Sequence, residues 1–147
     1  MKRIIYFLCA LLTTITLSCS ETELGSEPVQ DCSTVYCTYD LRWIAVKLVD
    51  QSGTPIALDR MKVTRVADGE DLTRTYLSEQ WNTFRSLGSY TIAGDLDREH
   101  IPSFKQTKLR FQGFIDDREV VKVDYVVTFD CCHISLVSGV VELTVSR

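Results

Sequence analysis

The chain of 147 residues predicts an all-β fold, a single antiparallel β-sandwich of about seven strands. The first observation behind this prediction is a two-residue alternation of apolar and polar side chains over residues 121–130. The second is the spacing of turn signals, which divide the segment after residue 37 into short strands. Residues 38–147 are long enough for one hydrophobic core, so we expect them to form one sandwich domain.

A leader occupies residues 1–18, where two basic residues precede a mostly apolar run over residues 4–17. The run is too short to span a bilayer and has the length of a signal peptide core. The serine and Cys19 that follow resemble the end of leaders cleaved by lipoprotein signal peptidase, although Thr16 stands where such leaders usually have leucine. The resemblance implies a lipoprotein signal peptide and lipidation at Cys19. The alternative is an ordinary secretory leader, and the chain is exported in both cases.

Residues 19–37 are expected to form an acidic, flexible tether, because they are rich in Ser, Glu and Thr and lack apolar periodicity. An acylated Cys19 with two or more acyl chains would anchor the protein stably. Ser20 is not the aspartate associated with inner-membrane retention, and residues 20–23 resemble the acidic export signal of some diderm bacteria. The resemblance implies an outer-membrane, lipid-anchored protein that is exposed on the cell surface.

The charge of the mature chain restricts its partners. Removing Lys2 and Arg3 with the leader leaves 14 of the 16 basic residues against 20 acidic ones, a net charge of 14 − 20 = −6. This balance argues against nucleic acid and anionic lipid headgroups as partners. The expected partners are the lipid bilayer, through acylated Cys19, and a protein or glycan whose identity the sequence does not give.

Four cysteines lie beyond Cys19, and they form two groups, Cys32 with Cys37 and the adjacent Cys131 and Cys132. An even count in an exported chain predicts disulfides. Pairing within the groups would require a strained ring between adjacent residues, so pairing between the groups is favoured and two connectivities remain open. The alternative is a metal or thiol redox site, since Cys131, Cys132 and His133 offer thiolate and imidazole ligands. Their spacing does not match that of structural zinc sites.

Alternation and turn residues place the strands of the domain in order. Turns are predicted at residues 51–55, 67–70 and 116–119, with a further break at Ser138-Gly139. The segments on either side of residues 116–119 are expected to pair as a hairpin. The apolar residues assigned to strands are Ile44, Val46 and Leu48; Met61, Val63 and Val66; Leu109, Phe111 and Ile115; Val121, Val123, Tyr125, Val127 and Phe129, with Val126 as an exception to the alternation; and Val141, Leu143 and Val145.

The stretch around Leu77, Trp81 and Phe84 fits two interpretations. Its apolar residues recur at helical spacing, with Ser78 as a possible N-cap and Gly88 as a possible stop, but they also fit an irregular crossover between sheets. We interpret the stretch as a loop with about one helical turn. Its two aromatic side chains are expected to belong to the core or to a lid over it.

Residues 49–56 resemble the strand end and Gly-x-Pro turn of carboxypeptidase regulatory-like, or transthyretin-like, domains. Gly88-Ser89-Tyr90 is similar to a later Gly-x-Tyr element of that family, and the resemblance covers residues 41–93. The chain departs from the family after Pro55, where residues 57–60 replace the usual Gly-Ala. The resemblance implies a sandwich without catalytic residues that serves as an interaction or stabilising module.

No pattern in the sequence predicts catalysis. The densest polar cluster comprises Asp95, Asp97, Glu99 and His100, lacks the spacing of a calcium loop, and is interpreted as a solvated loop. His100 and His133 have no nucleophile at a recognised spacing and are interpreted as surface or packing histidines. We therefore expect no catalytic residue, no cofactor and no metal. The expected function is that of a non-catalytic, membrane-anchored surface or periplasmic binding or structural module, and the alternative is a Cys/His metal-binding or thiol redox module.

Overall fold

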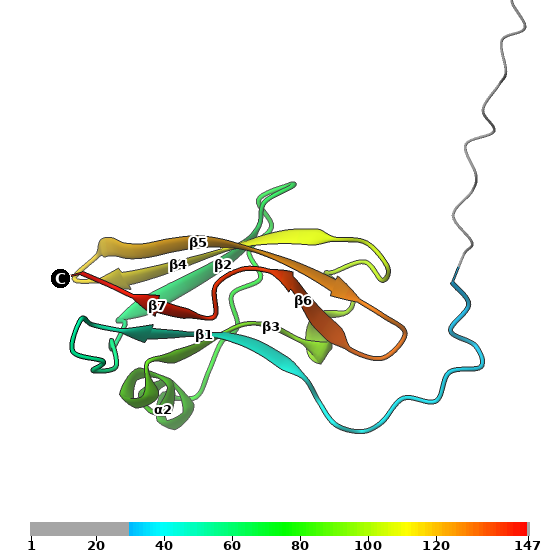
Figure 1. Cartoon of the computed structure of the whole chain (residues 1–147), viewed down its shortest axis with the longest axis horizontal. Coiled ribbons are helices and arrows are strands. Elements are labelled where there is room, and N and C mark those ends of the chain that lie inside the picture. Colours follow the sequence, from blue (N-terminus) through cyan, green and yellow to red (C-terminus); the bar gives the residue numbers. More distant parts are fainter. Residues whose placement is uncertain (1–29, 147) are drawn as a thin grey trace, which may run out of the picture.

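The structure is a computed structural model, and it describes residues 30–146. The leader, Cys19 and the first part of the expected tether lie outside the described residues. The described part folds into two facing sheets with one helix on the side of the smaller sheet (Figure 1). The elements are β1 (Trp43–Val49), β2 (Arg60–Arg65), α2 (Ser78–Leu87), β3 (Ser89–Gly94), the 3₁₀ turn η1 (Asp95–Asp97), β4 (Thr107–Ile115), β5 (Arg118–Phe129), β6 (Ile134–Ser138) and β7 (Glu142–Thr144). The predicted all-β sandwich of seven strands is confirmed.

The smaller sheet has the strand order β3-β1-β7, and the larger has the order β2-β4-β5-β6. β1 pairs antiparallel with β3 but parallel with β7, which is the one parallel pairing among the named strands. β7 reaches this position because the chain crosses from the larger sheet to the smaller one directly after β6. No described helix is long and apolar enough to cross a membrane.

The hairpin of β4 and β5 forms where the sequence predicts it. Asp116 and Asp117 make the turn with φ angles of 48° and 57°, the positive values that a two-residue hairpin turn requires. Tyr125, Val127 and Phe129 are buried on the inner face of β5, and Val126 is half-buried on the other face. The core between the sheets also contains the predicted residues of β1, which are Ile44, Val46 and Leu48.

The segment interpreted as a loop is a helix of ten residues, α2, so that interpretation is wrong. Its N-cap is Leu77 rather than Ser78, and the Gln80 side chain accepts a hydrogen bond from the Leu77 backbone N–H at 3.1 Å. Gly88 ends the helix with a φ of 62°, as its position predicts. Trp81 and Phe84 pack against the core, as expected, and the Trp81 ring lies 5.7 Å from that of Tyr90.

Tyr90 ties β3 to the segment that connects β1 with β2. Its buried hydroxyl donates to the carbonyl of Ile56 at 2.7 Å and accepts from the N–H of Leu58 at 2.7 Å. Tyr90→Phe removes the hydroxyl and so breaks both hydrogen bonds, and we expect the free energy of unfolding to fall by about 1–3 kcal/mol. Urea denaturation measures the change. The exposed Tyr39→Phe serves as the control, with an expected change within about 0.5 kcal/mol, and equal losses from both variants would contradict the assignment.

Asp124 on β5 lies directly opposite Arg110 on β4 and accepts hydrogen bonds from its Nε at 2.7 Å and from a terminal nitrogen at 3.0 Å. The hydrogen bonds from Arg110 are the main reason that the pKa of Asp124 is lowered to about 2, and Lys108 adds to this effect. A lowered pKa stabilises the fold above the unfolded value of about 3.9, and this contribution is lost as the pH falls through the folded value.

Asp124→Asn is expected to lower the free energy of unfolding by about 1 kcal/mol at neutral pH, the upper range for exposed pairs. The difference from the wild type should disappear as the pH falls through about 2, because Asp124 is then protonated. Urea denaturation across this pH range measures it, with the turn variant Asp117→Asn as control. A difference that persists in strong acid would assign the effect to packing rather than charge.

Candidate functional site

The two disulfides pair Cys32 with Cys131 and Cys37 with Cys132, with Cα–Cα distances of 5.4 and 5.2 Å. Pairing between the two groups of cysteines, favoured by the sequence, is therefore confirmed. The structure also decides between the two connectivities that the sequence leaves open. Both bridges fasten the segment before β1 to the turn between β5 and β6.

The bridges close a small covalent ring, which we call the disulfide ring. It consists of residues 32–37, six residues, and residues 131–132, two residues, joined through the two sulfur bridges. A backbone hydrogen bond from the N–H of Val35 to the carbonyl of Cys32 at 3.1 Å makes a turn inside it. The end of the segment expected to be a flexible tether, residues 32–37, is therefore held against the domain.

The disulfide ring presents apolar side chains to solvent. Tyr36, within the ring, and Tyr39, just after it, are fully exposed at 98% and 103%. Val35 and Phe104 are 46% and 38% exposed, and together with Tyr36 they border a shallow pocket of about 440 Å³. The polar residues around this pocket are Gln30, Thr38, Arg42, Asp130 and His133.

Asp95 carries a buried carboxylate that contacts His133, the residue after Cys132 of the disulfide ring. It accepts hydrogen bonds from the backbone N–H groups of Arg42 at 2.8 Å and Ile134 at 2.7 Å. The Nδ1 of His133 lies 2.8 Å from the Asp95 carboxylate, and the side chains are 10% and 7% exposed. His133 Nε2 lies 3.1 Å from the Thr38 hydroxyl, one residue beyond Cys37. This network joins the start of β1, the end of β3 and the start of β6 at one point.

Hydrogen bonds decide the charge state of the two carboxylates near the ring. Burial acts to raise the pKa of Asp95, but the hydrogen bonds from His133 and from the N–H groups of Arg42 and Ile134 outweigh it, so the pKa lies below its usual value. The backbone N–H groups of His133, at 2.7 Å, and Cys132, at 2.6 Å, lower the pKa of Asp130. Both carboxylates therefore act as anionic acceptors that fix the backbone of the β5–β6 turn.

The polar cluster interpreted as a solvated loop is partly buried, so that interpretation is wrong for two of its members. Asp95 belongs to the network just described, and Asp97 is 13% exposed, pairs with Arg74 at 2.5 Å and accepts from the N–H of Gly94 at 2.7 Å. The two carboxylates of η1 therefore have separate partners, since Asp95 contacts Arg42, His133 and Ile134 whereas Asp97 contacts Arg74 and Gly94. Glu99 is exposed.

The two histidines occupy separate environments. His100 Nδ1 lies 2.9 Å from Glu70 on the surface, whereas His133 is buried against Asp95. Within residues 30–146, no group of three or more His, Cys, Asp or Glu side chains is arranged to hold a metal ion. All four cysteines of this part of the chain are in disulfides, so none of them offers a thiolate to a metal in this state.

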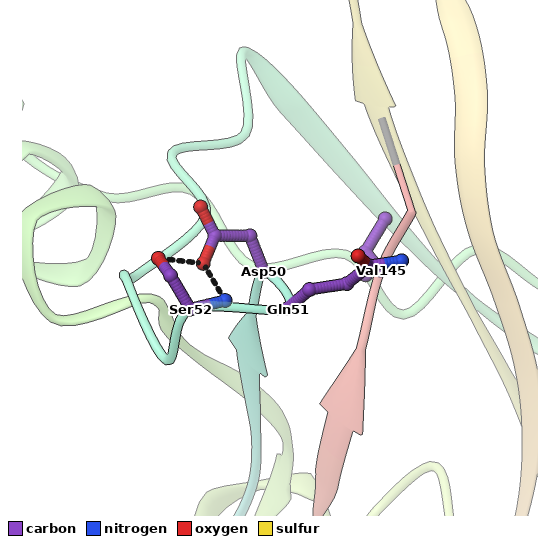
Figure 2. Close-up of a pocket in the computed structure, with 4 residues that line it drawn as sticks. All are labelled: Asp50, Gln51, Ser52 and Val145. Carbon is purple, nitrogen blue, oxygen red and sulfur yellow. Dashed lines mark hydrogen bonds between the residues drawn. The ribbon is translucent and has the colours of Figure 1, made fainter.

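A second pocket, of about 310 Å³, lies at the other end of the sandwich, beside the turn after β1 (Figures 1 and 2). Asp50 fixes this turn, because its Oδ1 accepts from the backbone N–H of Ser52 at 2.8 Å and from its hydroxyl at 2.6 Å (Figure 2). The same oxygen accepts from the N–H of Thr54 at 3.0 Å. The carboxylate is therefore used in turn formation, and we assign no ligand to this pocket.

Sequence reasoning identifies the four ring cysteines but misses the side chains around them. It treats residues 32–37 as part of a tether and so overlooks Tyr36, and it assigns no role to Tyr39 at the start of the domain. The available signal is the presence of two tyrosines in a polar segment next to paired cysteines. The sequence marks Asp95 as part of a polar cluster and His133 as a neighbour of the cysteines, but no signal joins these two residues, which are 38 residues apart and meet only in the folded chain. Comparison with protein-family models, with curated proteins and with solved structures finds no match to this chain.

Proposed function

We propose that this protein is an exported lipoprotein, anchored in the outer membrane through Cys19 and exposed on the cell surface, whose sandwich is a non-catalytic binding or structural module. The observation that carries the proposal is the disulfide ring. Two disulfides in a chain of this size are typical of oxidising compartments outside the cytoplasm. Export through the predicted leader would place the chain in such a compartment.

The place of the ring in the fold supports an anchored module. The chain that arrives from the predicted lipid attachment site meets the sandwich at the ring, at the end opposite the C-terminus (Figure 1). A pull on the tether is therefore transmitted to the β5–β6 turn through two covalent bridges. A binding module that works at a membrane surface benefits from such an attachment, because its fold does not fray from the tethered end.

The chemistry around the ring supports binding rather than catalysis. Asp95, Asp130 and His133 are engaged with backbone N–H groups or with one another, and these contacts shape the β5–β6 turn. The side chains that face solvent here include the aromatic rings of Tyr36 and Tyr39 and part of Phe104. Exposed aromatic side chains on a rigid support are common in recognition surfaces.

Substitution of the predicted attachment residue tests the proposal. Cys19→Ser is expected to move the protein from the membrane fraction to the soluble one, because the acyl chains can no longer be attached. Cys9→Ser, which removes another cysteine of the leader, is the matched control and should leave the protein in the membrane. Retention in the membrane of a Cys19→Ser chain whose leader has been removed, or a soluble wild type, would contradict the anchor. Protease digestion of intact cells then tests outward exposure, and protection of the domain would place it in the periplasm.

A further inference from the structure

We propose that the end of the sandwich that carries the disulfide ring docks on the lipid bilayer, with Tyr36 and Tyr39 in the headgroup region of a zwitterionic membrane. We call the surface formed by Val35, Tyr36, Tyr39 and Phe104 the ring face. This inference rests on the proposed lipid anchor and adds an orientation to it. The anchored domain would then lie against the membrane that holds it rather than extend freely from it.

The side chains of the ring face fit a membrane interface. Tyrosine has an apolar ring and a polar hydroxyl, and it is enriched where hydrocarbon meets water in membrane proteins. Tyr36 and Tyr39 have no covering side chains in the fold, at 98% and 103% exposure. Val35 and Phe104, which border the same pocket as Tyr36, supply apolar area beside it. Tyr39 does not line that pocket, but it is exposed two residues beyond Cys37, so a bilayer at this end of the domain would meet it together with the other three.

The short chain between Cys19 and the first described residue favours the bilayer as the surface that covers the ring face. Eleven residue steps separate Cys19 from Gln30, so covalent geometry limits the anchor to at most about 40 Å from the first described residue. A flexible chain of this length spans about 17–20 Å on average. β5 alone, with 12 residues, is about 40 Å long. The ring face is therefore the part of the domain that is kept closest to the lipid.

Tethering at this distance raises the effective concentration of bilayer at the ring face, so a weak intrinsic affinity is sufficient for contact. The disulfide ring also lowers the conformational entropy cost of docking. It holds Val35 and Tyr36 in a closed ring, and the contact of Thr38 with His133 fixes the residue after Cys37. Little conformational entropy is then lost when these side chains enter the interface.

The net charge of the chain indicates which lipid headgroups the ring face would contact. The mature chain carries a net charge of 14 − 20 = −6, and the segment around the ring face contains Asp31 and Asp40 against Arg42. Contact therefore depends on aromatic and apolar side chains rather than on attraction to anionic headgroups. We expect docking to be insensitive to salt and to be strongest on phosphatidylethanolamine and phosphatidylcholine surfaces.

Quenching of tryptophan fluorescence by brominated phospholipid tests the proposal on the full mature lipoprotein in vesicles. Tyr39→Trp, with both native tryptophans replaced by phenylalanine (Trp43→Phe and Trp81→Phe), places a single probe in the ring face. Arg118→Trp in the same background is the matched control, because it is exposed at the far end of β5. We expect several-fold stronger quenching of the probe at residue 39 than of the probe at residue 118, unchanged in high salt.

Hydrogen exchange supplies a second measurement that needs no substitution in the folded domain. Amides of residues 33–42 should exchange several-fold more slowly in the vesicle-bound lipoprotein than in the soluble Cys19→Ser chain, while those of the β4–β5 turn should not change.

Intact mass establishes in the same samples whether the protein is lipidated. A lipidated protein with equal quenching at both probes and no protection would overturn the docking but leave the anchor in place. In that case the ring face would be assigned to a protein, a glycan or a second copy of the chain. An unlipidated protein would overturn both.

Discussion

Replacing Cys32, Cys37, Cys131 and Cys132 together with serine is expected to lower the free energy of unfolding by about 7 kcal/mol. Removing only one bridge is expected to lower it by about 2.5 kcal/mol, whichever bridge is removed. The loss from the fourfold variant exceeds the sum of the two single losses by about 2 kcal/mol. The fourfold loss is comparable with the whole stability of a small domain, so that variant should be largely unfolded.

The overlap of the two long loops explains these unequal costs. The paired cysteines are 99 and 95 residues apart, so whichever bridge is present closes a long loop in the unfolded chain, worth about 4.7 kcal/mol in the chain-entropy model. Once one bridge is closed, the other adds only the disulfide ring of eight residues, worth about 2.5 kcal/mol. One bridge alone therefore retains most of the constraint.

Urea denaturation of Cys32→Ser/Cys131→Ser, of Cys37→Ser/Cys132→Ser and of the fourfold variant measures the three costs. The two single-bridge variants remain informative even where the fourfold variant does not fold. Losses of about 4–5 kcal/mol from each single bridge would show that the bridges act independently, and would contradict the conclusion that they share one long loop. Losses near zero would show that the bridges contribute no stability.

Asp95→Ala is expected to lower the free energy of unfolding by about 3–5 kcal/mol, because it removes one partner of a buried charged network. The change leaves the N–H groups of Arg42 and Ile134 and the Nδ1 of His133 without their acceptor. Thermal and urea denaturation measure the loss. Glu99→Ala, in the same part of the chain but exposed, is the control and should change the free energy by less than about 0.5 kcal/mol. Similar losses from both variants would contradict a structural role specific to Asp95.

The pH dependence of stability separates charge from packing at this site. Because the folded pKa of Asp95 is lowered, its ionised form stabilises the fold above the unfolded value of about 3.9. This contribution is lost as the pH falls through the lower, folded value. Asp95→Asn keeps the shape but not the charge, so its stability should fall less than that of the wild type in acid. Parallel pH profiles for the two proteins would show that the carboxylate charge does not contribute.

The sequence predicts the elements that depend on local signals. The β4–β5 hairpin follows from alternation on β5 and from the two aspartates of its turn, both of which act between neighbouring residues. The cross-pairing of the cysteines follows from the geometry of Cys131 and Cys132 alone. α2 is less evident, because Leu77 is a poor capping residue and its helix is stabilised by packing of Trp81 and Phe84 on the core.

The candidate site depends mostly on contacts that no local pattern reveals. Asp95 has a structural role only because the folded chain brings it into contact with His133, in the turn before β6, and with Ile134, the first residue of β6. The same holds for Tyr36, which is held at the surface of the domain by the bridges from Cys32 and Cys37 to residues 131–132. Long-range contacts of this kind require the folded arrangement of both sheets.

An exported, lipid-anchored chain with two intact bridges has a defined intact mass, which can be measured on the protein extracted from membranes. Mass is measured after alkylation, with and without prior reduction. We predict an acyl adduct on a chain that begins at Cys19, with no alkylation before reduction and four alkylated thiols afterwards. A chain without lipid whose thiols react before reduction would contradict the account and would redirect attention to Cys131, Cys132 and His133 as a thiol or metal site.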